Sequence, residues 1–264
     1  MFSLSLIRFY DILNVMQCGG NYMQIKDYIV SPDLLEKFEF HNYNHALEII
    51  TQAFSNEWTE IEECLRVLEI TTADIKKAGG NKSTIPKKFE DVLYPYGWRE
   101  IRISGDLHIK TFLKRASKKS KFSSVPYEEK DIKGYVDGHN IDFIKNRVAF
   151  DLEWNSKDQT FDRDLLAMRT YYECDIISVG VIITRAEELN DVFRTVYNYN
   201  SRKKQWQPIL SKYGASTTWM GKLLPRLDSR RNGGCPILAI GMKKKCITDW
   251  YEGYKDENNT ANEQ

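Results

Sequence analysis

The sequence predicts an α/β protein with a central mixed β-sheet flanked by helices. Residues 148–154 alternate between large apolar and acidic or small side chains, which is the period of two that a strand imposes. Residues 161–174 repeat apolar side chains at helical spacing, and residues 176–184 form a nearly continuous β-branched run, typical of a strand covered on both faces. Because a strand–helix–strand unit forms a right-handed crossover, the two strands are predicted to be parallel neighbours.

Apolar spacing predicts further elements on either side of this unit. They are, in chain order, helices at 43–54 and 58–68, a helix within 89–98 that stops at Pro95 before a turn at Gly97, and strands at 99–109 and 236–242. Residues 76–88 are polar and contain glycine, so we interpret them as a loop.

The composition predicts one folded domain. Hydrophobic residues make up 42% of the 264-residue chain and aromatic residues 12%, which is enough for a substantial core. We expect a single domain over residues 23–250, an extension over residues 1–22 and a disordered tail over residues 251–264. The first residues are apolar but interrupted by Arg8 and Asp11, so neither a transmembrane nor a signal segment is expected.

The charge and the cysteine spacing argue against a globally basic nucleic-acid-binding protein and against a cysteine zinc site. With 38 basic and 37 acidic residues the net charge is +1, so any binding to nucleic acid must come from local basic patches. The densest basic run is residues 110–121, which is either a solvated face or an arm that contacts phosphates. The five cysteines are scattered without zinc-site spacing, which favours a reducing, cytoplasmic location.

Three acidic residues, Asp142, Asp151 and Glu153, fall within what looks like a short β-hairpin. A two-residue turn at 145–146 would set Asp142 opposite Ala149 and on the same face as the other two acids. Asp142 and Asp151 would then be diagonal neighbours, with Cα atoms roughly 7–8 Å apart. Three anions on one patch repel each other, and a hard cation such as Mg²⁺ would relieve that repulsion.

This pattern has more than one interpretation. It is the layout used in metal-assisted phosphodiester hydrolysis, where two carboxylates hold the ion and the third residue orients or deprotonates water. Acids on a strand can also be an ordinary solvated face, as in a catalytically inactive DNA-binding module. Paired carboxylates that act as acid and base without metal, as in glycosidases, are a third interpretation.

Asp142 followed by Asp151-Leu152-Glu153 resembles the PD-(D/E)-x-K nuclease motif, in the BamHI-like variant where Glu or Gln replaces the Lys. The strings DFIKNRVAFDLEW, IISVGVIIT and GGCPILAIGM resemble the core of the BglII/BstYI family of restriction endonucleases in order and spacing. The resemblance covers about residues 24–246. It implies a restriction-endonuclease-like core and a type II restriction endonuclease that cleaves both strands of a short palindromic site, GATC-centred by analogy. A nuclease of the same fold in repair or mobile-element processing is the alternative.

The resemblance also implies roles for single residues. Asp142 and Asp151 would be ligands of Mg²⁺, and Glu153 would occupy the Lys position. Glu100, two residues after Trp98, would be a further acid of the catalytic site. Two departures from the pattern are Asp151, where these relatives have Glu, and the absence of a proline before Asp142.

Base recognition is expected from two loops beside the site, and the hydroxyl-bearing residues could equally be turns or caps. The residues are Asn155, Ser156 and Lys157 in the first loop and Ser216, Thr217 and Thr218 in the second. A palindromic duplex site implies a homodimer, for which the helix at 161–174 is one candidate interface. A cognate DNA methyltransferase is expected in the same system, and no membrane partner is expected.

Overall fold

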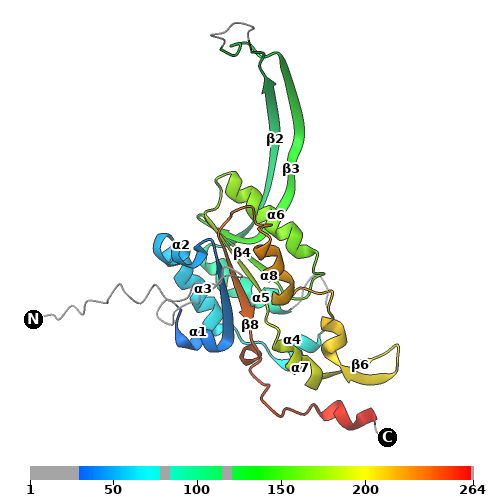
Figure 1. Cartoon of the computed structure of the whole chain (residues 1–264). Coiled ribbons are helices and arrows are strands. Elements are labelled where there is room, and N and C mark those ends of the chain that lie inside the picture. Colours follow the sequence, from blue (N-terminus) through cyan, green and yellow to red (C-terminus); the bar gives the residue numbers. More distant parts are fainter. Residues whose placement is uncertain (1–29, 78–83, 115–120, 263–264) are drawn as a thin grey trace, which may run out of the picture.

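The computed structural model describes residues 30–77, 84–114 and 121–262. Its centre is a six-stranded sheet in the order β1-β8-β5-β4-β3-β2 (Figure 1). The strands are β1 (Phe38–Tyr43), β2 (Arg99–Thr111), β3 (Glu128–Lys145), β4 (Val148–Glu153), β5 (Val179–Arg185) and β8 (Ile237–Met242). β4, β5 and β8 are parallel, whereas β1, β3 and β2 join antiparallel, so the predicted mixed sheet is confirmed.

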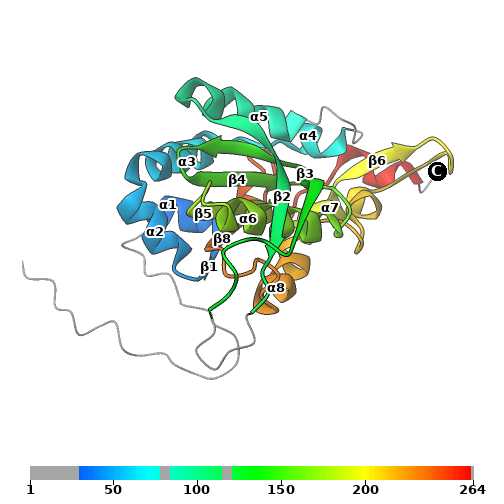
Figure 2. The same cartoon turned by 90° about the horizontal axis from the view of Figure 1, so that it is seen from above.

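Helices cover both faces of the sheet (Figure 2). They are α1 (Pro32–Lys37), α2 (Ala46–Ala53), α3 (Ser55–Val67), α4 (Thr72–Lys76), α5 (Thr84–Leu93), α6 (Thr160–Glu173), α7 (Leu189–Thr195) and α8 (Met220–Asp228). One core contains side chains of α1 to α5 and α7, and a second contains side chains of α6 and α8. A separate two-stranded ribbon is formed by β6 (Tyr197–Asn200) and β7 (Gln205–Pro208).

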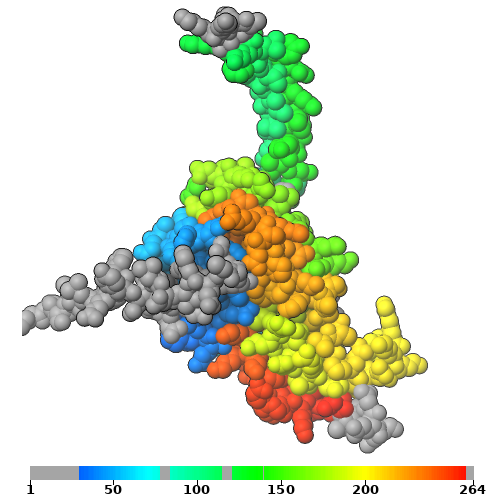
Figure 3. Space-filling view, in the orientation of Figure 1, coloured from blue at the N-terminus to red at the C-terminus, as the bar shows by residue number. Residues whose placement is uncertain are grey.

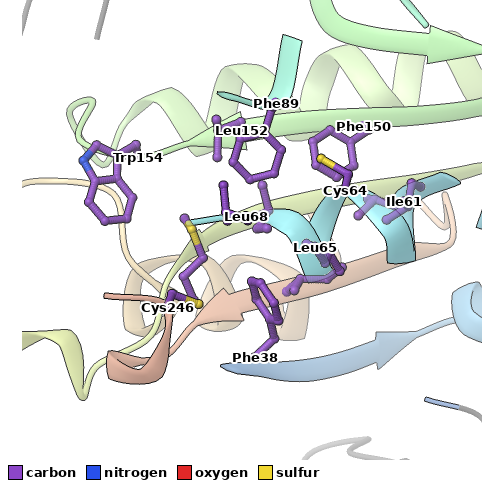
Figure 4. Close-up of a cluster of buried hydrophobic side chains, with 14 of the residues drawn as sticks. Phe38, Ile61, Cys64, Leu65, Leu68, Phe89, Phe150, Leu152, Trp154 and Cys246 are labelled. Atoms are coloured by element: carbon purple, nitrogen blue, oxygen red, sulfur yellow. The ribbon is translucent and has the colours of Figure 1, made fainter. Parts of the chain in front are cut away.

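Alternation along the strands assigns their side chains to the two cores. Phe150 and Leu152 of β4 lie in the first core, where they pack with Phe89 and Cys64 (Figure 4). Ala149, on the opposite face of the strand, belongs to the second core under α6. Each fully buried phenylalanine or leucine contributes about 1.5–3 kcal/mol, so both faces of the strand favour this one register.

The crossover predicted from the sequence is confirmed. The helix expected at 161–174 is α6, and the strand expected at 176–184 is β5. β4 and β5 are parallel, with Asp151 opposite Ile182. The final core strand expected at 236–242 is β8, which is also parallel to β5. Strand β4 therefore lies between two partners and is covered on both faces.

The loop expected at 76–88 is wrong in part, because α5 begins at Thr84. Ile85, Phe89 and Leu93 are spaced four apart and form one buried stripe that anchors the helix to the first core. Pro86 lies in the first turn, where a missing N–H breaks no intrahelical hydrogen bond. Residues 78–83 of the expected loop lie outside the described residues.

Strands β2 and β3 continue beyond the sheet as a two-stranded arm that stands clear of the body (Figures 1 and 3). The 13 residues of β2 span about 40 Å at the ordinary rise of a strand. One face of the arm carries cross-strand ion pairs, such as Lys133–Asp106 at 2.8 Å and Arg102–Asp137 at 3.1 Å. The other face carries Ile101, Ile103, Leu107, Ile109, Ile132 and Val136.

The basic run lies at the outer end of this arm. Lys110, Lys114 and Lys121 are exposed there. Lys110 pairs with Glu129 of β3 at 3.7 Å, whereas no acidic residue occurs in 111–114 or 121–127. Arg115, Lys118 and Lys119 lie outside the described residues.

The chain ends differ from expectation where the structure describes them. Residues Glu257–Asn262, expected in a disordered tail, form a 3-10 helix. Asp256 before it is buried, pairs with Lys76 at 2.6 Å and accepts the N–H of Tyr197 at 3.0 Å. The expected extension over residues 1–22 lies outside the described residues. Of the helices that are described, none has the length and apolar character needed to cross a membrane.

Candidate active site

The β3–β4 turn lies one residue later than expected. Lys145 pairs with Val148, so the turn is Asn146 and Arg147, and Asn146 adopts a φ of 51°. The prediction that Asp142 faces Ala149 is therefore wrong, since Ala149 pairs with Ile144. Moving the turn by one residue changes each cross-strand partner by two positions, which leaves every side chain on its predicted face.

Asp142 consequently faces Asp151 directly rather than diagonally. The last paired residues, Phe143 and Phe150, set these two acids opposite each other. The N–H of Leu152 donates to Oδ2 of Asp142 at 3.2 Å, and the N–H of Asp142 donates to Oδ1 of Asp151 at 3.4 Å. The two carboxylates meet at the point where the β3–β4 ladder ends.

Glu100 lies at the same level on the neighbouring strand. The pairs Ile101–Ile141 and Arg102–Asn140 bring Glu100 next to Asp142 on the same face, and the register of β2 and β3 shifts at Glu100, between Ile101 and Arg99. Its Oε1 accepts a hydrogen bond from Nδ2 of Asn140 at 2.8 Å. Glu100, Asp142 and Asp151 therefore form one row across β2, β3 and β4, although Glu100 is exposed.

The acids on β4 are buried. Asp151 is 4% exposed and Glu153 is 6% exposed, because α6 covers this face of the sheet. An ordinary solvated strand face would leave such carboxylates in water. That interpretation of the sequence is therefore wrong for Asp151 and Glu153.

A fourth acid, Asp164, joins the cluster from the second turn of α6. It is 2% exposed, and in the described part of the chain its Oδ2 and the Oε2 of Glu153 are both buried without a hydrogen-bond partner. Sequence reasoning missed this residue. The signal was its place beside Phe161, Leu165 and Met168 on the buried stripe of the helix, where an acid is unexpected.

Burial and mutual repulsion raise the pKa values of these carboxyl groups. Burial is the largest cause at Asp151, followed by the charge of Asp142, and its pKa lies well above the ordinary value. Burial and then the charge of Asp164 raise the pKa of Glu153 to about 8. Burial raises the pKa of Asp164 to about 6, although the neighbouring Arg163 opposes the shift. Ionising the whole cluster therefore needs a positive charge beside it.

The carboxylate oxygens of this cluster are suitable ligands for a hard cation, although they do not converge on one point. Carboxylate oxygens are the ligands that Mg²⁺ prefers, and two of them, on Glu153 and Asp164, lack any partner. Within residues 30–77, 84–114 and 121–262, no three acidic, histidine or cysteine side chains converge as metal ligands. The carboxylates of Asp142 and Asp151 instead accept backbone N–H groups, and these bonds compete with an ion.

The two segments expected to read DNA bases lie side by side. Lys157 and Thr217 form an antiparallel bridge, the N–H of Thr218 donates to the carbonyl of Ser156, and the N–H of Asp158 donates to that of Ser216. Ser156, Lys157 and Ser216 are exposed, and Asn155 is half-buried. The pairing joins residues 155–157 and 216–218 into one continuous surface directly after the acids of β4, and we call this surface the ledge.

The two threonine side chains of the second segment face the protein. The hydroxyl of Thr217 donates to the carbonyl of Gly214 at 2.7 Å, so the turn role holds for this residue. Thr218 is 0% exposed, so its hydroxyl does not reach a base edge in this conformation. The expectation of a direct base contact is not supported by the burial of Thr218.

Arg185, which sequence reasoning also missed, ties the ledge to the sheet. Its buried guanidinium donates to the carbonyls of Trp154 and Thr218 at 2.8 and 2.7 Å and to the hydroxyl of Thr217 at 2.6 Å. It also stacks near Tyr213, 5.0 Å from the ring centre. The end of β4 and the second segment are thereby held at a fixed separation.

A mixed sheet with helices on both faces, and with paired acids where a β-hairpin meets a parallel crossover, defines an α/β protein of the restriction-endonuclease-like fold. The family model described as restriction endonuclease BglII/BglIII matches residues 38–242, and the chain belongs to that family. It is therefore a type II restriction endonuclease, a site-specific deoxyribonuclease that acts on double-stranded DNA. No curated protein matches the chain.

Proposed function

We propose that this endonuclease cleaves both strands of a short palindromic site with Mg²⁺ as cofactor, using Asp142, Asp151, Glu153 and Glu100. The observation that carries the proposal is the row of Glu100, Asp142 and Asp151 on neighbouring strands, next to the buried Glu153. Buried carboxylates this close together are unfavourable unless a cation or a proton compensates them. A divalent ion compensates them and serves the hydrolysis of a phosphodiester.

Asp142 and Asp151 would hold the ion, and Glu100 would support it from the exposed side. When bound, Mg²⁺ supplies positive charge that offsets the charge developing on the scissile phosphate. Each aspartate accepts a backbone N–H on one carboxylate oxygen, which would leave the other oxygen of each for the ion.

Glu153 would orient the attacking water or take its proton. Burial raises the pKa of Glu153 to about 8, so the group is mostly protonated at neutral pH until a nearby cation favours its ionised form. Once ionised, it would be a stronger base than an ordinary glutamate. The water oxygen forms a bond to phosphorus as the bond to the leaving oxygen breaks. The leaving oxygen then takes a proton from solvent, which completes the hydrolysis.

The ledge beyond β4 would read the bases. Asn155, Ser156, Lys157 and Ser216 offer an amide, two hydroxyls and an ammonium group that can bond base edges in the major groove. Thr217 and Thr218 would act indirectly, by shaping the ledge. A GATC-centred site is the expectation from the family resemblance.

The outer end of the β2–β3 arm would contact the DNA backbone outside the recognition site. Lys114 and Lys121 are exposed there with no acidic residue in 111–114 or 121–127, in a chain whose net charge is only +1, and Lys110 nearby is paired with Glu129. Contacts of this kind add affinity but no sequence preference.

A palindromic site is matched by two copies of the chain related by a two-fold axis, so we propose a homodimer. α6 stays a candidate for the interface because Leu166 and Tyr172 on its outer side are exposed. Cleavage of the host's own sites would be prevented by a cognate DNA methyltransferase in the same system.

The test is plasmid digestion with Mg²⁺ by the wild type, Asp142→Ala and Asp151→Ala. We expect discrete fragments from the wild type, loss of cleavage by at least about 100-fold in both variants, and no cleavage in EDTA. Asp191→Ala is the matched control, because Asp191 is an exposed aspartate on α7 whose ion pair among the described residues is with its neighbour Arg194. Wild-type cutting by both site variants would refute the assignment of the chemistry, and a smear would refute site specificity.

A further inference from the structure

An arginine in the first turn of α6 lies beside the buried acids. Nη2 of Arg163 is 4.0 Å from Oε1 of Glu153. Nε and Nη2 of Arg163 both donate to Oδ1 of Asp164, at 3.3 and 3.2 Å. The guanidinium therefore contacts two acids of the cluster and is held in position by one of them.

The same side chain faces solvent with most of its surface. Arg163 is 67% exposed although its anchor Asp164 is almost fully buried. A guanidinium carries five N–H donors, and the two bonds to Asp164 use only two of them. Three N–H donors remain, and on a side chain this exposed they are accessible to a phosphate that approaches from solvent.

Arg163 supplies a charge that the motif lacks at its third position. The general motif has a lysine there, whereas this chain has Glu153, so the position carries no positive charge. Among the described residues, Arg163 is the one cation that forms an ion pair with Glu153. Partial burial lowers the pKa of Arg163, but the charges of Asp164, Glu153 and Asp151 outweigh this and raise it overall. The guanidinium stays charged at any working pH.

We propose that Arg163 is a catalytic residue whose guanidinium donates hydrogen bonds to a non-bridging oxygen of the scissile phosphate, and that Asp164 is the positioning residue that holds it. The proposal rests on the catalytic role proposed above for Asp151 and Glu153. Non-bridging oxygens gain negative charge as water attacks phosphorus, so donors fixed in advance lower the barrier. The planar fork of arginine suits this task because it matches phosphate geometry with two parallel bonds.

The experiment measures single-turnover cleavage of a duplex that contains the recognition site, with the full chain in excess and Mg²⁺ present. We expect Arg163→Ala to lower the rate by about 10²–10³-fold, as for the loss of one transition-state donor. DNA affinity in EDTA should change by less than about threefold. Arg163→Lys should recover part of the rate, since it restores the charge but not the fork. Arg194→Ala, which removes a similarly exposed arginine paired to an aspartate on α7, is the matched control.

Two further measurements separate catalysis from a structural role. Millimolar guanidinium should raise the rate of Arg163→Ala but not that of the wild type. Asp164→Asn should lose less rate than Arg163→Ala, because the amide oxygen can still accept from Arg163. A wild-type rate for Arg163→Ala would overturn the proposal. So would a rate loss that equals the loss of DNA affinity and does not respond to guanidinium. Cleavage by Asp151→Ala, in contrast, would refute the function on which the proposal rests.

Discussion

The ionised carboxylate of Asp151 destabilises the folded protein, and it lies where a metal ligand is proposed. It is buried, faces Asp142 and lies near Asp164 and Glu153, so its ionised form has little water and several negative neighbours. Burying such a charge costs free energy unless a cation or a proton accompanies it. The same crowding would favour binding of a cation, as proposed above.

Removing this charge should therefore stabilise the protein and abolish its response to metal. In EDTA, we expect Asp151→Asn to melt roughly 2–4 °C above the wild type, which corresponds to about 1 kcal/mol in a domain of this size. Added Mg²⁺ should raise the melting temperature of the wild type, because a ligand that binds only the folded state stabilises it, and should leave the variant unchanged. Thermal scans with and without Mg²⁺ measure both effects, with Asp191→Asn as the control. Equal Mg²⁺ responses of wild type and variant would contradict the ligand role of Asp151.

Local sequence patterns predict those residues of the candidate site that lie on one strand or hairpin. Asp142, Asp151 and Glu153 follow from strand alternation and turn parity, and these survive an error of one residue in the turn. Asp164 and Arg185 could not be found in this way. Their importance depends on burial against segments distant in sequence, because Arg185 binds residues about 30 positions away on both sides.

At the scale of elements, long-range pairing overrides local preference in the β2–β3 arm. Residues 128–140 are polar and contain Gly134 and Gly138 at positive φ, which is not the composition of a typical strand. They form the outer part of β3 because β2 offers them a continuous antiparallel partner. The strands with alternating or β-branched sequences, by contrast, were predictable because each is buried on both faces.

The outer arm should be dispensable for folding and important for DNA affinity. None of the described residues between 107 and 132 belongs to either buried core, so replacing this segment with an Asn-Gly turn between Asp106 and Lys133 should shift the melting temperature by less than about 3 °C. DNA affinity should fall, and the slope of log K against log salt should decrease by about 0.9 for each phosphate that the protein no longer neutralises. Lys114→Glu combined with Lys121→Glu, with the arm kept, should reproduce the loss of affinity. An unchanged salt slope in both variants would exclude the arm from DNA binding.

The C-terminal segment should loosen in acid. Burial raises the pKa of Asp256, but the bonds from Lys76, Tyr197 and Asn258 outweigh it and lower the pKa overall. A carboxyl group with a lowered folded-state pKa stabilises the protein above its unfolded pKa of about 3.9, and this stability is lost as the pH falls through the folded value. Asp256→Asn should therefore cost roughly 1.5–3 kcal/mol at pH 7 and progressively less below about pH 4. Urea unfolding of both proteins across this range measures the difference, and a constant difference at all pH values would contradict the assignment.

At the scale of the whole molecule, one chain contains one row of acids, whereas double-strand cleavage at a palindrome needs two equivalent attacks. The described residues hold a single site of this kind, at the end of the β3–β4 ladder. Two chains related by a two-fold axis would bring one site to each strand. The number of strands cut should then depend on how many active chains the assembly holds.

Mixed dimers provide the sharpest test of this arrangement. A dimer of one wild-type chain and one Asp151→Asn chain, purified through two different affinity tags, should bind the site normally but cut only one strand. A supercoiled plasmid should accumulate as the nicked circle, with linear product reduced by about 100-fold relative to the wild-type dimer. The wild-type chain carrying both tags is the control for purification. If the mixed dimer linearises the plasmid at half the wild-type rate or faster, the hypothesis that each chain cleaves one strand is wrong. Failure to recover any doubly tagged species would show that the chain acts without a stable partner.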